Sequence, residues 1–339
     1  MANITFLIGN GFDLNLGLKT SYRDFYGSLV KDSKNAIIRE ILEEKDYWAD
    51  MEFSLGQCLD KYSPETVDSF IADFIDIEDH LTSYLKKQNE RFAVVDDSKV
   101  ADSFGKSLQS INTQIAPRYQ GLYNRIIHSI SEPIMYSFIC FNYTSTLDSI
   151  VNTLADRPPF SSHSFGNNGK ASDRIALPLH IHGKLEELMV VGVNDEKQIN
   201  NPDLRGNEAL VSVLVKPKAN DGVGNDNTQA AKTIIGNSRI IYVYGLSMGA
   251  TDKLWAQSLF EWLRGSAERL LIFNLYDSNY NRNSASRVIK WERDAINRIA
   301  TVNELDPKII DEVRSRICCI SKPNAFSIKG YGLADERDK

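Results

Sequence analysis

The sequence has few cysteines, and their spacing fits no common metal or disulfide framework. The 339 residues include four cysteines, of which Cys318 and Cys319 are adjacent, and no C-x-x-C pair occurs. Adjacent cysteines suit neither a zinc ribbon nor the regular spacing of a disulfide-rich secreted domain. We therefore expect reduced thiols, as is usual for cytoplasmic proteins.

Long apolar runs and an excess of basic residues are also missing. No stretch reaches the roughly 18 consecutive apolar residues that a membrane-spanning helix needs, and the opening MANITFLIG lacks the basic segment of a signal peptide. The formal net charge is −6, whereas a general nucleic-acid binder carries surplus Lys and Arg to neutralise phosphates. We expect a cytoplasmic protein with no membrane segment and no general affinity for nucleic acids.

The sequence does contain a series of short apolar segments that end in glycine, asparagine or histidine, several of them followed by a helical pattern. Such segments are typical of a mostly parallel sheet with helices on both faces. The predicted fold class is α/β, a Rossmann-like sheet with a large helical insertion. The predicted strands are ITFLIG, IMYSFICFNY, IALPLHIHGKL, LMVVGVND, RIIYVYG, RLLIFNLYD and a last one near RICCISK.

The segment between the first two strands has a different pattern. Apolar residues recur there at helical spacing, as in VDSFIADFIDIEDHLTSYLKK, and no convincing strand occurs. We predict that residues 1–30 and 131–339 form the Rossmann-like domain and that 31–130 form a helical insertion beside the active cleft. Two polar stretches, 161–173 and 217–229, are predicted to be loops that serve as lids.

The first turn, LIGNGFD, departs from the dinucleotide-binding fingerprint. G-x-G-x-x-G requires a third glycine, and Leu14 occupies that position. Gly9 and Gly11 still let the backbone approach a ligand closely, and Asn10 is a polar side chain at the strand tip. Asp13 either addresses a ribose hydroxyl or caps the following helix, where the dipole favours a carboxylate. A tight turn without a ligand is the alternative.

Polar residues at two later strand ends are candidates for catalysis. Asn142, in CFNYTSTLD, either caps the next helix or orients a water or a sugar hydroxyl. His180 and His182 share one face if their segment is a strand. For this pair a metal site lacking an obvious third ligand, buried structural histidines and a general base all stay open. Because Gly183 would leave open space beside the ring, His182 is the preferred base.

The segment GLSMG at 245–249 matches the G-x-S-x-G pattern of a nucleophile elbow. Hydrolases with that elbow place the catalytic histidine after the serine, whereas the last histidine here, His182, precedes Ser247. We therefore expect Gly245 and Ser247 to bind ribose or phosphate through the hydroxyl and backbone N–H groups.

The segment DYWADMEFSL lies in the predicted insertion. Its Trp48 and Glu52 are four positions apart, which is about one helical turn. We interpret Trp48 as a core residue and Glu52 as a solvated acid, with a functional role for the pair as the less favoured alternative.

Together these segments resemble the bacteriophage abortive infection AbiH family. LIGNGFDLNLGLKTSYRDF is similar to the opening of that family, and the W-x-x-x-E, FNYTSTLD, HIHGKL and YGLSMGATD blocks are similar to its later motifs. The resemblance spans roughly residues 4–280. AbiH proteins in turn resemble the sirtuin-like fold of antiphage defence proteins, which is an NAD-type Rossmann sheet with a helical insertion.

The resemblance implies particular roles for some residues. In defence-associated sirtuin-like domains an asparagine and a histidine in comparable blocks cleave NAD⁺, and these positions correspond to Asn142 and His182. The sirtuin zinc-binding cysteine pairs are absent, which argues against protein deacetylation, and neither a metal nor a resident cofactor is expected. The implied cofactor contacts come from the Gly-rich opening and the G-x-S turn, namely Gly9, Asn10, Gly11, Gly245 and Ser247, to which Asp13 adds a group for ribose hydroxyls.

The resulting hypothesis is an antiphage abortive-infection effector that releases nicotinamide from NAD⁺. Asn142 positions a water or a ribose hydroxyl, and His182 relays its proton. The alternatives are a non-catalytic sensor of NAD⁺ or ADP-ribose and an interaction module of a defence or toxin assembly. Expected partners are the nucleotide, a phage-derived or host trigger protein and further copies of this chain in a homo-oligomer.

Overall fold

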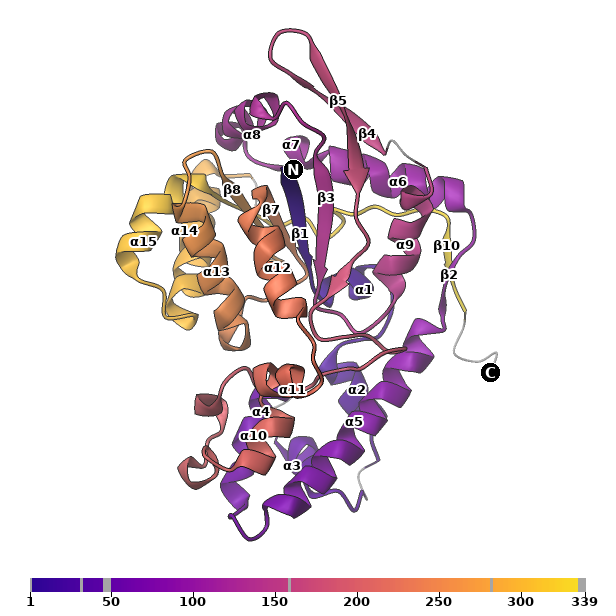
Figure 1. Ribbon diagram of the computed structural model, residues 1–339, viewed down its shortest axis with the longest axis vertical. Helices are drawn as coiled ribbons and strands as arrows, with labels where there is room; N and C mark the ends of the chain where they lie inside the picture. The colour runs from indigo at the N-terminus through magenta and orange to yellow at the C-terminus, as the bar shows by residue number, and fades with distance from the viewer. Residues whose placement is uncertain (1, 31–32, 45–49, 158–159, 281–282, 335–339) are drawn as a thin grey trace.

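A mostly parallel sheet forms the centre of the molecule (Figure 1). The computed structural model describes residues 2–30, 33–44, 50–157, 160–280 and 283–334. The sheet order is β4-β5-β3-β1-β7-β8-β9, with β6 paired to β3, and all neighbours from β5 to β9 are parallel. The strands are β1 Asn3–Ile8, β3 Met135–Cys140, β4 Ser161–Phe165, β5 Gly169–Ile175, β6 Leu179–His180, β7 Ser238–Tyr244, β8 Leu270–Asn274 and β9 Ile317–Ile320.

The central strands are apolar on both faces because helices cover both faces. All six residues of β1 are buried. Ile4 and Phe6 belong to one apolar cluster, whereas Leu7 belongs to the cluster on the opposite face, as the alternation of a strand requires. The first cluster includes side chains of α6 Asp97–Gln109, α8 Pro117–Ser129 and α9 Thr146–Ala155, and the second those of α12 Asn227–Gly236, α13 Lys253–Arg264, α14 Ala285–Val302 and α15 Pro307–Val313.

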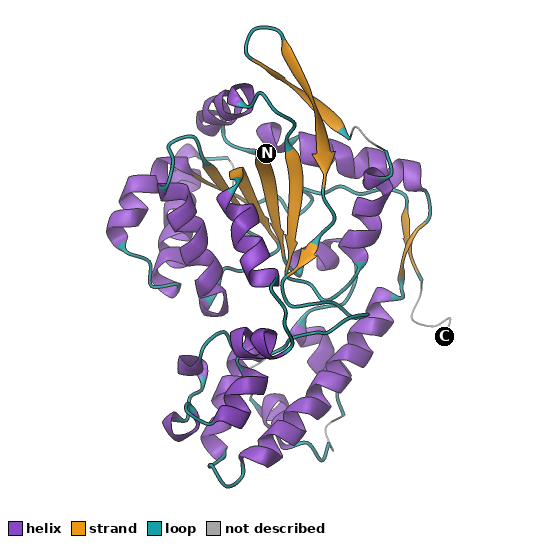
Figure 2. Cartoon of the chain, in the orientation of Figure 1, coloured by secondary structure: helices purple, strands orange, loops and turns teal. Residues whose placement is uncertain are grey.

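A third apolar cluster forms a separate helical lobe beyond the carboxyl ends of the strands (Figure 2). The predicted insertion 31–130 does not coincide with this lobe. Helices α6 and α8 pack in the core of the sheet, while α10, which follows residue 131, packs in the lobe through buried Leu210 and Leu214, and α11 packs against α10. The helices of the lobe are α2 Tyr22–Ser28, α3 Ala36–Glu43, α4 Met51–Cys58, α5 Val67–Asn89, α10 Glu208–Leu214 and α11 Lys216–Gly222.

Most predicted strands are confirmed, and the exceptions have physical reasons. LMVVGVND contributes only an isolated bridge between Val193 and Val215, because its apolar residues pack into the lobe rather than the sheet. IALPLHIHGKL contains only the two-residue β6. A strand also occurs within the segment where none was predicted, since β2 Phe92–Val94 pairs with β10 Tyr331–Leu333. Its three residues are only partly buried, so its sequence pattern is weak.

Neither predicted lid is a loop over the strand ends. Residues 161–173 form most of the β4–β5 hairpin, and β5 pairs with Met135 and Tyr136, at the start of β3. The hairpin therefore lies at the far end of the sheet from the lobe (Figure 1), where His163 Nδ1 contacts Asp173 Oδ1 at 2.7 Å. Residues 217–229 are mainly helical, because they belong to α11 and the start of α12.

Two findings concern the thiols and the lengths of the apolar helices. All four cysteines are buried free thiols. Among the described residues no helix is both long and apolar enough to span a membrane.

The loops after β1 and β7 touch through glycine backbone. Gly11 N donates to Gly245 O at 3.0 Å, and Gly9 N donates to Tyr244 O at 2.9 Å. A Cβ on Gly11 would lie 2.6 Å from the Cα of Gly245, and Gly245 itself has a φ of +73°. The neighbouring loop occupies the space that these glycines leave, so their first effect is to let two backbone turns meet.

This contact makes Gly245→Ala a test of the packing. We expect the variant to lose about 1–3 kcal/mol of unfolding free energy, because alanine disfavours a positive φ and its Cβ would overlap backbone atoms. Chemical denaturation measures the loss. The control is Gly27→Ala in α2, where an added Cβ meets nothing within 4 Å. Equal stability of the two variants would contradict the described contact.

Candidate functional site

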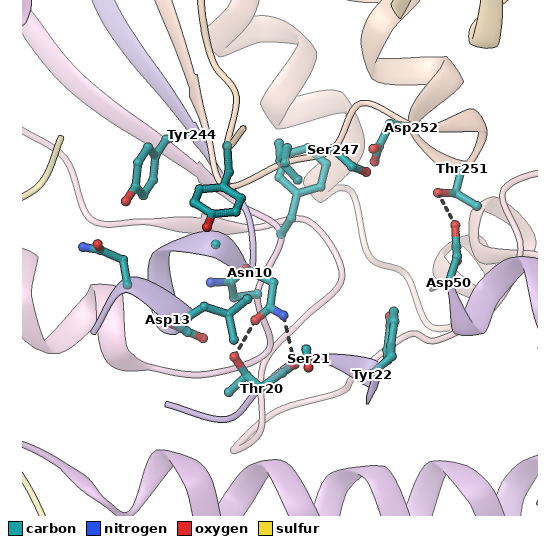
Figure 3. A pocket seen from close by; sticks show the side chains of 18 of the residues that line it. Asn10, Asp13, Thr20, Ser21, Tyr22, Asp50, Tyr244, Ser247, Thr251 and Asp252 are labelled. Atoms are coloured by element: carbon teal, nitrogen blue, oxygen red, sulfur yellow. Dashed lines mark hydrogen bonds between the residues drawn. The ribbon is translucent and has the colours of Figure 1, made fainter. Parts of the chain in front are cut away.

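A cavity of about 800 Å³ lies between the carboxyl ends of the central strands and the helical lobe. From β1 the chain goes to β3 on one side of the sheet and then crosses to β7 on the other. The cavity is therefore at the point where the strand order reverses, the usual ligand site of open parallel sheets. Figure 3 shows two of the polar contacts around it, between Asn10 and Thr20 and between Asp50 and Thr251.

Most of the predicted site residues line this one cavity. Gly9 is not among the lining residues of the described chain, and Trp48 lies outside the described residues. His180 lies behind the cavity wall, since it is not a lining residue either. The predicted residues that line the cavity are Asn10, Gly11, Asp13, Asn142, His182, Gly245 and Ser247.

Asn142 follows β3, and a charged histidine holds its backbone. His180 Nδ1 lies 2.8 Å from the carbonyl oxygen of Asn142, and Nε2 lies 2.7 Å from Asp148 Oδ2. Burial alone would lower the pKa of His180, but chiefly the hydrogen bond to Asp148 raises that pKa to about 10. A protonated ring donates from both nitrogens, so His180 is a positioning residue that fixes Asn142 and the start of α9.

Four buried polar atoms around the cavity have no hydrogen-bond partner among the described residues. They are Oδ1 of Asp13, Oδ1 and Nδ2 of Asn142, and Nδ1 of His182. An unsatisfied buried polar atom costs about 1–3 kcal/mol, and such atoms are rare in proteins. All four are shielded from solvent and gather in the wall of one cavity, so a ligand or water that reached them would complete their hydrogen bonds.

Asp13 is a buried acid in the first turn of α1 Gly11–Asn15, whose N-cap is Asn10, so of the two alternatives for Asp13 the structure excludes the cap. Thr144 Oγ1 donates to its Oδ2 at 2.6 Å. Burial raises the pKa of Asp13 to about 6, although the hydrogen bond from Thr144, the nearby side-chain amide of Asn142 and the charge of His180 each lower it in part. The Asn142 amide is near the Asp13 carboxyl, but the two do not meet the geometry of a hydrogen bond. The carboxyl group therefore titrates near neutral pH beside Asn142.

The turn after β1 does not present a phosphate cradle. Gly11 N is bonded to Gly245 O and Phe12 N to Gly9 O. Asn10 uses its side chain within the protein, because Nδ2 donates to Thr20 O at 3.0 Å and Oδ1 accepts from Thr20 Oγ1 at 2.5 Å. Asn10 thus ties the loop that leads to the lobe, and Asp13 would repel an anion here.

His182 follows β6, so it does not share a strand face with His180. Its ring lies edge-on to Phe141, with 6.0 Å between the ring centroids. Burial, together with the charge of Lys216, lowers the pKa of His182 well below 6.5, so the imidazole is neutral at physiological pH. The prediction of open space beside Gly183 is wrong, because a Cβ there would lie 1.6 Å from Leu188 O.

The sequence pointed only in part to the charged groups that the lobe contributes, since a functional role for Glu52 was the less favoured alternative and Lys216 was not a candidate. Glu52 Oε1 accepts from Lys216 Nζ at 2.6 Å, and both side chains line the cavity. The interpretation of Glu52 as a solvated acid is therefore wrong. Asp50 caps α4 and also accepts from Thr251 Oγ1 at 3.0 Å, which joins the lobe to the loop after β7 (Figure 3). The i,i+4 spacing with Trp48 was the only local signal.

The turn at 245–249, after β7, also lines the cavity, through Gly245, Leu246 and Ser247. Met248 has a φ of +53°, and its carbonyl oxygen accepts from Asn303 Nδ2 at 2.9 Å. Burial raises the pKa of Asp252 to about 6, while the charge of Lys216 and the hydroxyl of Ser247 are among the groups that lower it. The half-buried carboxyl of Asp252 is thus the acid–base neighbour of Ser247.

The fold and the cavity define a doubly wound α/β protein with a candidate ligand site at its topological switch point. A model of the family described as bacteriophage abortive infection AbiH matches residues 5–274, and the chain belongs to this family. The match covers all the motif blocks named above, which confirms the resemblance. Family membership indicates an antiphage abortive-infection role. Among curated proteins, none matches the chain.

The raised pKa of Asp13 predicts how stability varies with pH. The native carboxyl titrates at about 6, above its ordinary value of 3.8, so from about pH 4 to pH 6 the native state binds more protons than the unfolded state. Stability therefore falls as pH rises through this window. Glu52 and Asp252, with pKa values of about 7 and about 6, act in the same direction.

Asp13→Asn should remove part of this dependence. Relative to the wild type, we expect the variant's unfolding free energy at pH 8 to rise, compared with that at pH 4, by on the order of 1–3 kcal/mol. The reason is that the amide has no buried charge to form. Urea unfolding at both pH values measures the gain. Asp102→Asn, at an exposed position on α6, is the control and should leave the dependence unchanged. A pH dependence that Asp13→Asn leaves intact would contradict the assignment.

Proposed function

We propose that this AbiH protein is an abortive-infection effector that binds NAD⁺ in the cavity and hydrolyses the bond between nicotinamide and ribose. The observation that carries the proposal is the group of unpartnered polar atoms on Asp13, Asn142 and His182. They supply donors and acceptors for ribose hydroxyls and for one water. The proposed partners are a phage-derived or host trigger and a second copy of the chain.

The size and lining of the cavity suit a dinucleotide. Its volume of about 800 Å³ lies within the range of about 300–1,000 Å³ that is usual for small-molecule sites. Arg298 and Lys322 line it and offer positive charge to a diphosphate, whereas Asp13 and Glu52 would repel one. The nicotinamide ribose therefore belongs beside Asn142. Aromatic side chains available to stack on the rings are Tyr22, Phe141, Trp255 and Tyr276.

The side chains match the demands of N-glycosidic cleavage. Nicotinamide leaves as a neutral molecule and needs no proton, while the ribose acquires positive charge in an oxocarbenium-like transition state. An ionised Asp13 stabilises that charge, and the Asn142 amide holds a ribose hydroxyl or the attacking water. The neutral His182 ring takes a proton through Nδ1 and passes it on. Acid–base groups of this kind contribute about 10²–10⁴-fold.

One observation favours a different function. The pKa of His182 is held well below 6.5, which makes the ring a weak base. In a non-catalytic sensor, the same cavity would bind NAD⁺ or ADP-ribose and change the affinity for a partner protein. The two functions differ in whether nicotinamide is released.

The test is to incubate the full chain with NAD⁺, with and without phage lysate, and to measure nicotinamide by chromatography. We expect Asn142→Ala and His182→Ala each to lower its release by about 10²-fold or more, with NAD⁺ affinity changed by less than about tenfold. His128→Ala, at an exposed position on α8, should match the wild type. Binding without release in both conditions would support the sensor, and absence of binding would contradict both functions.

A further inference from the structure

Glu52 and Lys216 form a nearly enclosed ion pair on the lobe side of the cavity. Glu52 lies near the start of α4, and Lys216 is the first residue of α11. Nζ and Oε1 are 2.6 Å apart, and the Lys216 and Glu52 side chains are only 4% and 12% exposed. Both line the cavity from helices of the lobe, and Asn142 lines the same cavity from the end of β3.

An enclosed ion pair is weak evidence for a role in the stability of the lobe. Breaking a buried ion pair is costly, but replacing both partners by apolar residues is often neutral or stabilising. The same lobe has another pair, in which Glu40 meets Lys61 at 3.2 Å, with the lysine 64% exposed and neither residue lining the cavity. The enclosed pair is therefore better explained by the cavity than by the packing of the lobe.

Several ionisable groups surround Glu52. Burial raises its pKa to about 7, and Lys216 lowers it in part, so both protonation states occur at physiological pH. Lys216 also acts on His182 through its charge, so it lies within electrostatic reach of both side chains. The other groups that interact electrostatically with Glu52 are Tyr22 of α2, Tyr143 after β3, Asp50 before α4 and Asp252 after β7.

The proposed hydrolysis leaves a proton without a stable site. Attack of water on ribose releases one proton, and the neutral His182 ring does not retain it, because burial and Lys216 disfavour the charged ring. Arginine and lysine side chains offer hydrogen-bond donors and no acceptor for a proton. Three carboxylates with raised pKa values line the cavity, and Asp13 is already assigned to the charge on the ribose. Glu52 and Asp252 both interact with Lys216, and Glu52, with the higher pKa of about 7, is the stronger base of the two.

We propose that Glu52 is the final acceptor of this proton and that Lys216 holds the carboxylate at the cavity. The inference rests on the proposed function. The water oxygen forms a bond to C1′ of the ribose. The bond between C1′ and the nicotinamide nitrogen breaks, and the electron pair of that bond leaves with nicotinamide. One water proton passes through His182 to Glu52 and then to solvent. The products are ADP-ribose, nicotinamide and a proton.

The test compares Glu52→Gln with the wild type in NAD⁺ cleavage. We expect nicotinamide release to fall by about 10²-fold or more, with the Kd for NAD⁺ within about threefold. The plot of kcat/KM against pH should have an acid limb near the pKa of Glu52, about 7, in the wild type, and no such limb in the residual activity of the variant. Glu40→Gln, in the pair outside the cavity, is the matched control and should retain full activity.

Two further variants keep the test independent of folding. Lys216→Met should move the acid limb to higher pH, because the lysine charge lowers the pKa of Glu52. The double variant Glu52→Gln/Lys216→Met leaves no buried charge unpaired, so it should fold and be as inactive as Glu52→Gln.

Three results would overturn the proposal. Glu52→Gln or the double variant could retain wild-type release, Lys216→Met could leave the acid limb in place, or Glu52→Gln could lose NAD⁺ binding together with activity. In each case, nicotinamide release by the wild type would still support the proposed function. A wild type that binds NAD⁺ but releases no nicotinamide, with or without lysate, contradicts the proposed function itself, and the proton path with it.

Discussion

The backbone contact between Gly11 and Gly245 fixes the positions of the other cavity groups. It brings the loops after β1 and β7 within hydrogen-bonding distance at the point where the strand order reverses. Only residues without a Cβ permit this approach, because an added carbon would overlap backbone atoms on the facing loop. Asn10 at the end of β1, Asp13 in α1 and Ser247 on the loop after β7 therefore line a common cavity.

The two walls of the cavity are held in different ways. On the sheet side, the charged ring of His180 connects the carbonyl group of Asn142 to Asp148 of α9. On the lobe side, Asp50 reaches across to Thr251, and Glu52 pairs with Lys216. Both walls thus keep polar groups buried at a cost in stability. Unpartnered atoms and carboxyl groups with raised pKa values are typical of a functional site, where stability is given up for chemistry.

Much of the sheet side was predictable from the sequence, because carboxyl ends of parallel strands meet at one edge. Polar residues after β1, β3, β6 and β7 could thus be placed together before any contact was known. The lobe side was not predictable, because Glu52 and Lys216 are 164 positions apart and no periodic pattern links them. LMVVGVND has the composition of a strand, but its apolar residues pack against the lobe, so tertiary packing overrode local propensity.

A crystal structure of the full chain with ADP-ribose tests the central claim most directly, namely that the unpartnered atoms of Asp13, Asn142 and His182 form a nucleotide site. The account predicts the ribose in the cavity, with the Asn142 amide and Nδ1 of His182 within hydrogen-bonding distance of its hydroxyls or of one bridging water. The diphosphate should lie toward Arg298. ADP-ribose bound elsewhere, with those atoms satisfied by neighbouring protein groups, would contradict the account.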